Sequence, residues 1–123
     1  MMKKFYFFIV CFFGISLSLN AKDLKFIDGL EDIPLMPGLE QNLDKTISFG
    51  NEEARFIEVY LTSSKVGFKK VEVFYKESLP QLGWVYQGTD NNVIIFYRDG
   101  ESLTFQKESD KPLKIRITIK NRI

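Results

Sequence analysis

Residues 65–84 read KVGFKKVEVFYKESLPQLGW, and apolar side chains recur along them at steps of three and four. This period predicts an amphipathic α-helix over residues 65–82. The serine pair at residues 63–64 is typical of a helix N-cap, while Pro80 predicts a kink or a tightened turn before Gly83 ends the helix. The apolar stripe consists of Phe68, Val71, Tyr75, Leu79 and Leu82, with Phe74 beside it.

Short β-rich runs flank this helix on both sides. Two precede it around a turn at residues 50–53, and four follow it, with Asp99-Gly100 as the clearest hairpin turn. The last run alternates most regularly, which predicts one buried and one solvent-facing side. The expected strands are residues 46–49, 55–62, 84–87, 93–98, 102–107 and 113–120.

Strands that cluster around one helix, rather than alternating with helices, predict an α+β fold. We expect a mostly antiparallel sheet of about five to six strands with one helix packed on one face, in the order β-β-α-β-β-β-β. A small closed barrel is the competing architecture. It would leave the apolar face of the helix without a partner.

The first 21 residues, MMKKFYFFIVCFFGISLSLNA, are typical of a secretory signal peptide. Lys3 and Lys4 precede an apolar run that is shorter than the roughly 20 residues a membrane-spanning helix needs. We therefore expect cleavage after Ala21 and a periplasmic or secreted protein without a membrane span. An uncleaved tether in the inner membrane is the alternative.

Residues 22–44 are expected to form an irregular acidic arm in front of a single α+β domain at residues 45–123. Their apolar side chains follow no sustained period, and two prolines and two glycines interrupt them. Four apolar side chains lie so close together that exposing all of them would be unfavourable, so we expect the arm to dock on the domain. A partner-binding segment is the alternative. The four are Ile33, Leu35, Met36 and Leu39.

The composition removes several classes of chemistry. The chain of 123 residues contains no histidine, and its only cysteine, Cys11, lies in the leader. Zinc sites with thiolate or imidazole ligands and nucleophilic catalysis assisted by histidine are therefore excluded. Paired carboxylates remain as a catalytic option, but the acidic residues gather in the arm and the turns. We predict no catalytic residues, no metal site, no cofactor and no enzyme activity.

The charge is nearly balanced, with 17 basic and 16 acidic residues. Such a balance gives no field that would favour nucleic acid, so we expect no nucleic-acid partner.

Two motifs, DIPLMPGL at residues 32–39 and FYKESLPQLGW at residues 74–84, resemble a family of short exported alphaproteobacterial proteins. In that family a PLMPGL-like element precedes a strand, a helix with this kind of ending, and a β-meander. The resemblance covers nearly all of the chain after the leader and implies no catalytic residues. A helix ending in L-x-x-x-G-W before a meander is also similar in layout to small envelope-assembly and lipoprotein accessory domains. This favours a binding role.

Two groups of residues are candidates for binding. The first is Leu35 with the turn Met36-Pro37-Gly38, since a constrained turn that presents a flexible thioether is a low-entropy contact surface. Its alternative is a turn that pins the arm to the core.

The second group is aromatic. Trp84 and Tyr86 share one strand face and, with Tyr60 and Tyr97, could line a groove for a peptide or a lipid tail. Core packing beneath the helix is the alternative for Trp84.

A basic row near the end of the chain is a weaker candidate. It could bind phosphate or anionic lipid head groups, but a strand facing water needs polar residues in any case. The row consists of Lys114, Arg116, Lys120 and Arg122.

Together these patterns predict an exported periplasmic binding or protein-interaction module without catalytic activity. Its contact with an envelope protein would use the PLMPGL arm or the open face of the sheet. The alternative is a carrier or inhibitor domain that holds a small apolar or acyl ligand between helix and sheet, under Val71, Tyr75 and Leu79 and near Trp84.

Overall fold

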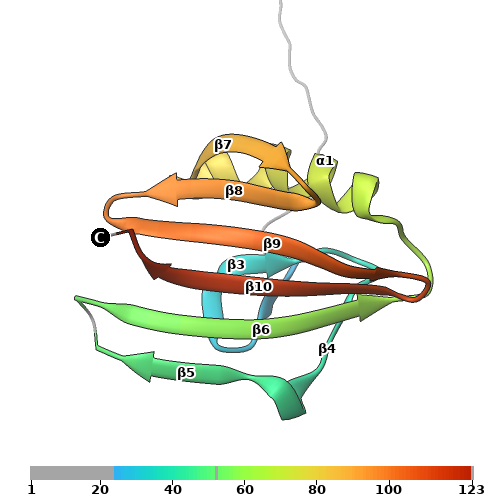
Figure 1. The fold of residues 1–123 in the computed structure, drawn as a ribbon, viewed down its shortest axis with the longest axis horizontal. Helices are drawn as coiled ribbons and strands as arrows, with labels where there is room; N and C mark the ends of the chain where they lie inside the picture. Colours follow the sequence, from blue (N-terminus) through green and yellow to red (C-terminus); the bar gives the residue numbers. More distant parts are fainter. Residues whose placement is uncertain (1–23, 52, 123) are drawn as a thin grey trace, which may run out of the picture.

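The computed structural model describes residues 24–51 and 53–122, and a seven-stranded antiparallel sheet dominates it (Figure 1). The sheet order is β4-β6-β10-β9-β8-β7, with β5 also paired to β6. The strands are β4 (Glu40–Gln41), β5 (Ile47–Gly50), β6 (Arg55–Ser63), β7 (Val85–Asp90), β8 (Val93–Arg98), β9 (Glu101–Asp110) and β10 (Leu113–Asn121). The predicted α+β class is confirmed, with seven strands in the sheet in place of five to six.

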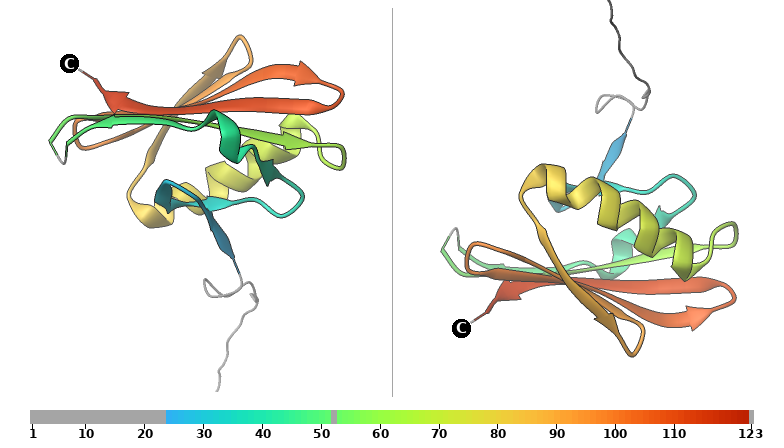
Figure 2. Two further views of the ribbon diagram at one scale, coloured as in Figure 1. Left: turned by 90° about the horizontal axis from the view of Figure 1, so that it is seen from below. Right: turned by 90° about the horizontal axis from the view of Figure 1, so that it is seen from above.

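One face of this sheet is covered and the other is bare. Helix α1 (Phe68–Ser78), the 3-10 helix η4 (Leu79–Leu82) and a separate hairpin of β2 (Lys25–Ile27) and β3 (Leu30–Leu35) lie on the same side (Figure 2). No described helix or hairpin lies over the opposite side, which Figure 1 shows from the front. We call this bare side the outer face.

The core fills the space between the sheet and the covering layer. Its strand residues alternate, because successive side chains in a strand point to opposite faces. Tyr75 of α1 packs on Phe105 of β9 with ring centroids 4.4 Å apart, and Phe105 meets Phe96 of β8 at 6.1 Å. Alternate residues of β6 and β10 complete the core: Ile57, Val59, Leu61, Leu113, Ile115, Ile117 and Ile119. The regular alternation predicted for the last strand is confirmed.

In place of the expected irregular arm, the chain forms regular structure before β5. The hairpin β2–β3 is followed by β4 and a short 3-10 helix, η3 (Leu43–Lys45). Ile33 and Leu39 are buried in the core, and Leu35 and Met36 pack half-buried against it, as docking requires. Strands β2 and β3 were not predicted because they are short and because a register shift after Phe26 interrupts the alternation of their side chains.

The helix is shorter than the apolar period predicts, but its ending is as expected. The last turn tightens into η4, where Pro80 lies, and Gly83 closes it with a left-handed φ of 93°. The N-cap differs: Gly67 occupies it, and the hydroxyl of Ser63 instead accepts from the N–H groups of Lys65 and Val66 at 2.9 and 3.1 Å. Ser63 thus forms the turn after β6, and the helix begins later.

Candidate functional site

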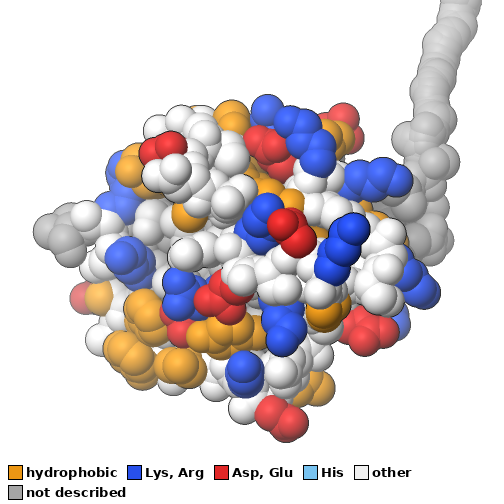
Figure 3. Space-filling model, turned by 45° about the vertical axis from the view of Figure 1, so that its right-hand side comes forward, with side chains coloured by type: hydrophobic (Ala, Val, Ile, Leu, Met, Phe, Trp, Pro, Cys, Tyr) orange, Lys and Arg blue, Asp and Glu red, His pale blue; other side chains and the backbone are white. Residues whose placement is uncertain are grey.

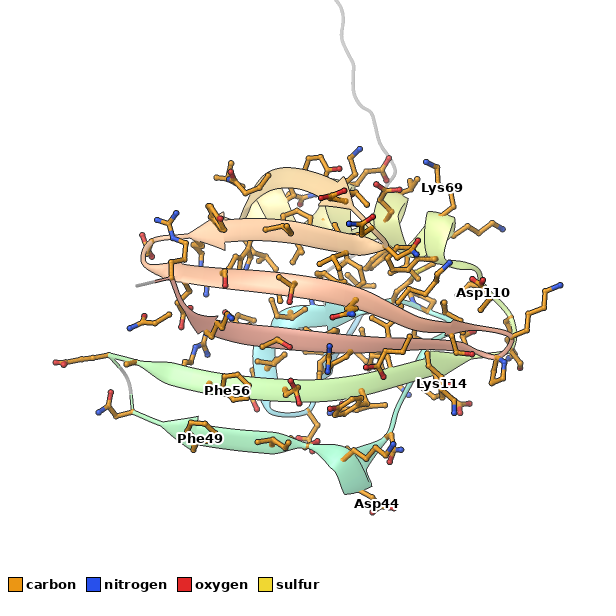
Figure 4. All side chains as sticks on the ribbon, viewed as in Figure 1. Asp44, Phe49, Phe56, Lys69, Asp110 and Lys114 are labelled. Atoms are coloured by element: carbon orange, nitrogen blue, oxygen red, sulfur yellow. The ribbon has the colours of Figure 1, made fainter. Side chains whose placement is uncertain are left out.

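The outer face carries an exposed apolar strip along its β5 edge. We call Ile47, Phe49 and Phe56 the aromatic strip. Phe49 and Phe56 are opposite each other on β5 and β6, and their rings stack at 5.1 Å (Figure 4). Phe49 is 64% exposed and Ile47 is 44% exposed. Hydrophobic side chains gather over these two strands in Figure 3, beside charged ones. Exposed apolar patches rimmed by polar groups are typical of interaction sites.

Polar side chains that are hydrogen-bonded to one another occupy the middle of the outer face. The hydroxyl of Tyr60 donates to Glu58 at 2.8 Å, and this bond raises the pKa of Tyr60. Arg116 of β10 donates to Gln106 of β9 at 2.6 Å and lies 3.5 Å from Glu108. These contacts fix the orientation of side chains that would otherwise be mobile in solvent.

The basic row lies on the same outer face as the aromatic strip. The partners of Lys114 and Arg116 across the sheet are Thr62 and Tyr60 of β6, whereas the intervening Ile115 is buried. Arg122 stacks over the ring of Tyr97 at 4.3 Å and donates to the carbonyl of Asp99 at 2.9 Å. The outer face therefore combines aromatic and cationic groups.

A charged cleft lies at the end of the sheet where the β5–β6 and β8–β9 turns meet. Its volume is about 750 Å³, and its lining includes Phe49, Arg55, Arg98 and Glu101. Arg55 forms two hydrogen bonds with the Glu101 carboxylate, at 2.7 and 3.0 Å, and these raise the pKa of the guanidinium.

The second arginine of the cleft is paired as well. Arg98 donates to Asp32 of β3 at 2.6 Å, so each arginine has a carboxylate partner. Asp32 also lies 3.7 Å from Arg55, so this one carboxylate links the β2–β3 hairpin to both arginines. In the described part of the chain, no three acidic, cysteine or histidine residues are placed to hold a metal ion.

The PLMPGL candidate lies at the end of β3 and is tied to the helix. Buried Tyr75 donates its hydroxyl to the Pro34 carbonyl at 2.6 Å and accepts from the Met36 N–H at 3.2 Å. Gly38 adopts a left-handed φ of 99°, and Pro37 is the exposed residue of the turn. Leu35 and Met36 contribute to packing. This geometry favours the turn as an anchor of the N-terminal segment.

The predicted aromatic groove is not present, because its members lie on opposite faces of the sheet. Tyr86 is the cross-strand partner of buried Phe96 and packs on it at 5.5 Å, on the helix side. Tyr60 and Tyr97 are on the outer face. Trp84 is buried beneath the guanidinium of Arg98, at 4.2 Å from the ring, as the core-packing alternative expects.

The space proposed for an acyl ligand is filled. Val71, Tyr75 and Leu79 are fully buried, and none of them lines any of the four main clefts formed by the described residues. An apolar groove of about 260 Å³ lies instead between the end of the helix and the β2–β3 hairpin. It is lined by Phe26, Pro34, Phe74 and Leu82, among others.

Sequence reasoning missed the aromatic strip, although a signal for it exists. The turn at residues 50–53 places Phe49 opposite Phe56, and the alternation that buries Ile57 turns Phe56 outward. No pattern in the sequence indicated the ion pair of Asp32 with Arg98, because β3 was not predicted.

No protein-family model, curated protein or solved structure matches this chain. The resemblance to the short exported proteins therefore remains a prediction. The signal peptide and its cleavage after Ala21 fall on residues outside the described ones. Within residues 24–51 and 53–122, the structure contains no helix with the length and apolar character needed to cross a bilayer.

Proposed function

We propose that this protein is an exported periplasmic binding module without catalytic activity, and that its outer face binds a protein of the cell envelope. One observation carries the proposal: the sheet is covered on one side only, and its bare side exposes the aromatic strip. Interface cores are enriched in aromatic side chains and arginine relative to the rest of a protein surface. The aromatic strip provides the aromatic side chains, and Arg116 and Arg122 provide the arginines.

The charges of the outer face indicate the chemistry of the partner. Four basic side chains lie there, Lys114, Arg116, Lys120 and Arg122, against the two carboxylates of Glu58 and Glu108. A partner surface with an apolar centre and acidic residues around it would complement this arrangement. Charge complementarity raises association rates and selects among partners.

The internal hydrogen bonds of the outer face also support a binding role. The pairs Tyr60–Glu58 and Arg116–Gln106 already hold long side chains in place. Ordering a rotamer-rich side chain on binding costs about 0.5–1.5 kcal/mol, and part of that cost is already met in the free protein.

Site-specific photo-crosslinking in intact cells tests the proposal. A photoreactive amino acid at Phe56, on the outer face, is expected to give a discrete crosslinked envelope protein. The matched control is Val73, which is 48% exposed on α1, away from the sheet. A crosslink from Phe56 but not from Val73 is the expected result. Equal crosslinking from both positions, or none from Phe56, would contradict the proposal.

The apolar-ligand alternative now depends on a different site. The groove between the helix end and the β2–β3 hairpin exposes Phe26 and Leu82, at 39% and 38%. Its volume of about 260 Å³ is slightly below the 300–1,000 Å³ that is typical of small-molecule pockets. The outer face is therefore the better supported candidate.

A further inference from the structure

The two edges of the seven-stranded sheet are protected to different degrees. On β7, the register shifts between Tyr86 and Gly88, and a bulge of this kind discourages pairing with another strand. The Thr89 hydroxyl also donates to Glu72 of α1 at 2.7 Å, which ties this edge to the helix. The β7 edge thus has two features that oppose strand addition.

The β5 edge lacks these features. Its four residues, ISFG, include no proline and no charged side chain, their register with β6 is regular, and all four are exposed. Figure 1 shows β5 as the outermost strand of the sheet. An exposed edge with apolar side chains is a template for an added strand.

The hydrogen-bond pattern shows which backbone groups of β5 are available. The Asn51 N–H donates to the Ala54 carbonyl at 3.1 Å. The neighbouring cross-strand pair, Gly50–Arg55, is therefore of the non-hydrogen-bonded type. Hydrogen-bonded and non-hydrogen-bonded pairs alternate along antiparallel strands. The backbone groups of Phe49 therefore bond to β6, whereas the N–H and C=O of Ser48 point away from β6. Ser48 therefore presents both groups to an incoming strand.

We propose that β5 pairs antiparallel with β5 of a second copy of this chain, about a twofold axis at Ser48. The two sheets then continue as one, and the two aromatic strips lie next to each other. The pairing goes beyond the proposed function and does not depend on it.

The sequence around Ser48 is complementary to itself in this register. Ile47 of each copy is opposite Phe49 of the other, on the outer face, at non-hydrogen-bonded positions where side chains approach most closely. At the ends, this register puts Lys45 of one copy opposite Asn51 of the other, in the turn that also carries Glu53. The twofold axis makes each of these contacts twice. An unrelated peptide would match this edge only by chance, so the second copy is the occupant that the edge fits.

Sedimentation equilibrium of the purified full chain at increasing concentration tests the pairing. The average mass is expected to rise from one chain toward two, and Phe49→Lys is expected to hold it at one, since lysine on an edge strand opposes pairing. Val85→Lys is the matched control on the β7 edge, because Val85 is 60% exposed and Phe49 is 64% exposed. It is expected to leave the association unchanged. Thermal melts establish that both variants are folded.

A covalent readout keeps the proposal testable if association is weak. Paired Ser48 residues would have Cα atoms about 5.5 Å apart, within disulfide reach. In a chain with Cys11→Ser, the variant Ser48→Cys is expected to form a disulfide-linked dimer on mild oxidation, and Val85→Cys is not. A monomer at every concentration with no Ser48→Cys dimer would overturn the proposal. The proposal would also be overturned if Phe49→Lys left the association unchanged, or if a different protein were found paired with the β5 edge.

Discussion

Replacement of Trp84 by alanine is expected to lower the free energy of unfolding by about 3–5 kcal/mol, the usual cost of truncating a large buried aromatic. Trp84 is 1% exposed and is covered by the guanidinium of Arg98 at 4.2 Å. The variant would lose this packing and leave a cavity beside Gly83, where the chain passes from η4 to β7. Small domains have a total stability of only about 5–15 kcal/mol, so the variant would approach the limit of folding. Urea denaturation followed by circular dichroism measures the loss.

Trp84→Phe serves as the control for this prediction. The indole N–H is buried and has no hydrogen-bond partner among the described residues, so its removal breaks no bond there. The phenyl ring keeps part of the packing, and we expect a loss of about 1–2 kcal/mol. If the phenylalanine and alanine variants lost the same stability, the packing of Trp84 would not explain the effect.

Tyr75→Phe is expected to cost about 2–4 kcal/mol, although it removes a single oxygen atom. That oxygen donates to the Pro34 carbonyl at 2.6 Å and accepts from the Met36 N–H at 3.2 Å. Both backbone groups would lose this partner, and an unsatisfied buried polar group costs about 1–3 kcal/mol. The loss would fall on the contact between α1 and the end of β3. Chemical denaturation measures the total, and hydrogen exchange at Met36 locates it.

Tyr86→Phe is the matched control, because the Tyr86 hydroxyl bonds to Thr89 at an exposed site, at 2.7 Å. Water can replace that bond, so we expect a loss below about 1 kcal/mol. Equal losses in the Tyr75 and Tyr86 variants would contradict an anchoring role for Tyr75.

The pH dependence of stability gives a second check on Tyr75. Burial raises its pKa above the ordinary value of about 10, so the folded protein holds this proton where the unfolded chain has released it. The contribution of Tyr75 is therefore complete below about pH 10 and is lost as the pH rises above that value. Tyr75→Phe cannot ionise, so its stability is expected to fall less steeply in that range. Identical slopes would count against the burial of the phenol.

The predictable parts of this fold are those with a sustained period. The stripe from Phe68 to Leu82 identified the helix, and the alternation from Leu113 to Ile119 identified the last strand. β4 contains only two residues, which is too short for any period to show. The hairpin β2–β3 depends on tertiary contacts that bury Ile27 and Leu30, and these contacts leave no regular pattern in the sequence.

The candidate site was harder to predict than the fold, because it depends on which strands are neighbours. Trp84, Tyr86, Tyr60 and Tyr97 are all aromatic, but only the register of β7 on β8 and of β10 on β6 shows that they divide between the two faces. The outer face draws residues from β5, β6, β9 and β10, which are distant in sequence. A single sequence indicates the period of a strand and not the identity of its neighbours.

Hydroxyl-radical footprinting tests most directly the claim that the outer face is the binding surface. The purified protein is oxidised alone and after addition of a detergent-solubilised envelope fraction, and the rate at each side chain is measured. We expect slower oxidation at Phe56 and Tyr60, and unchanged rates at Phe26 and Phe74 in the groove. Unchanged rates on the outer face, or protection confined to Phe26 and Phe74, would contradict the account.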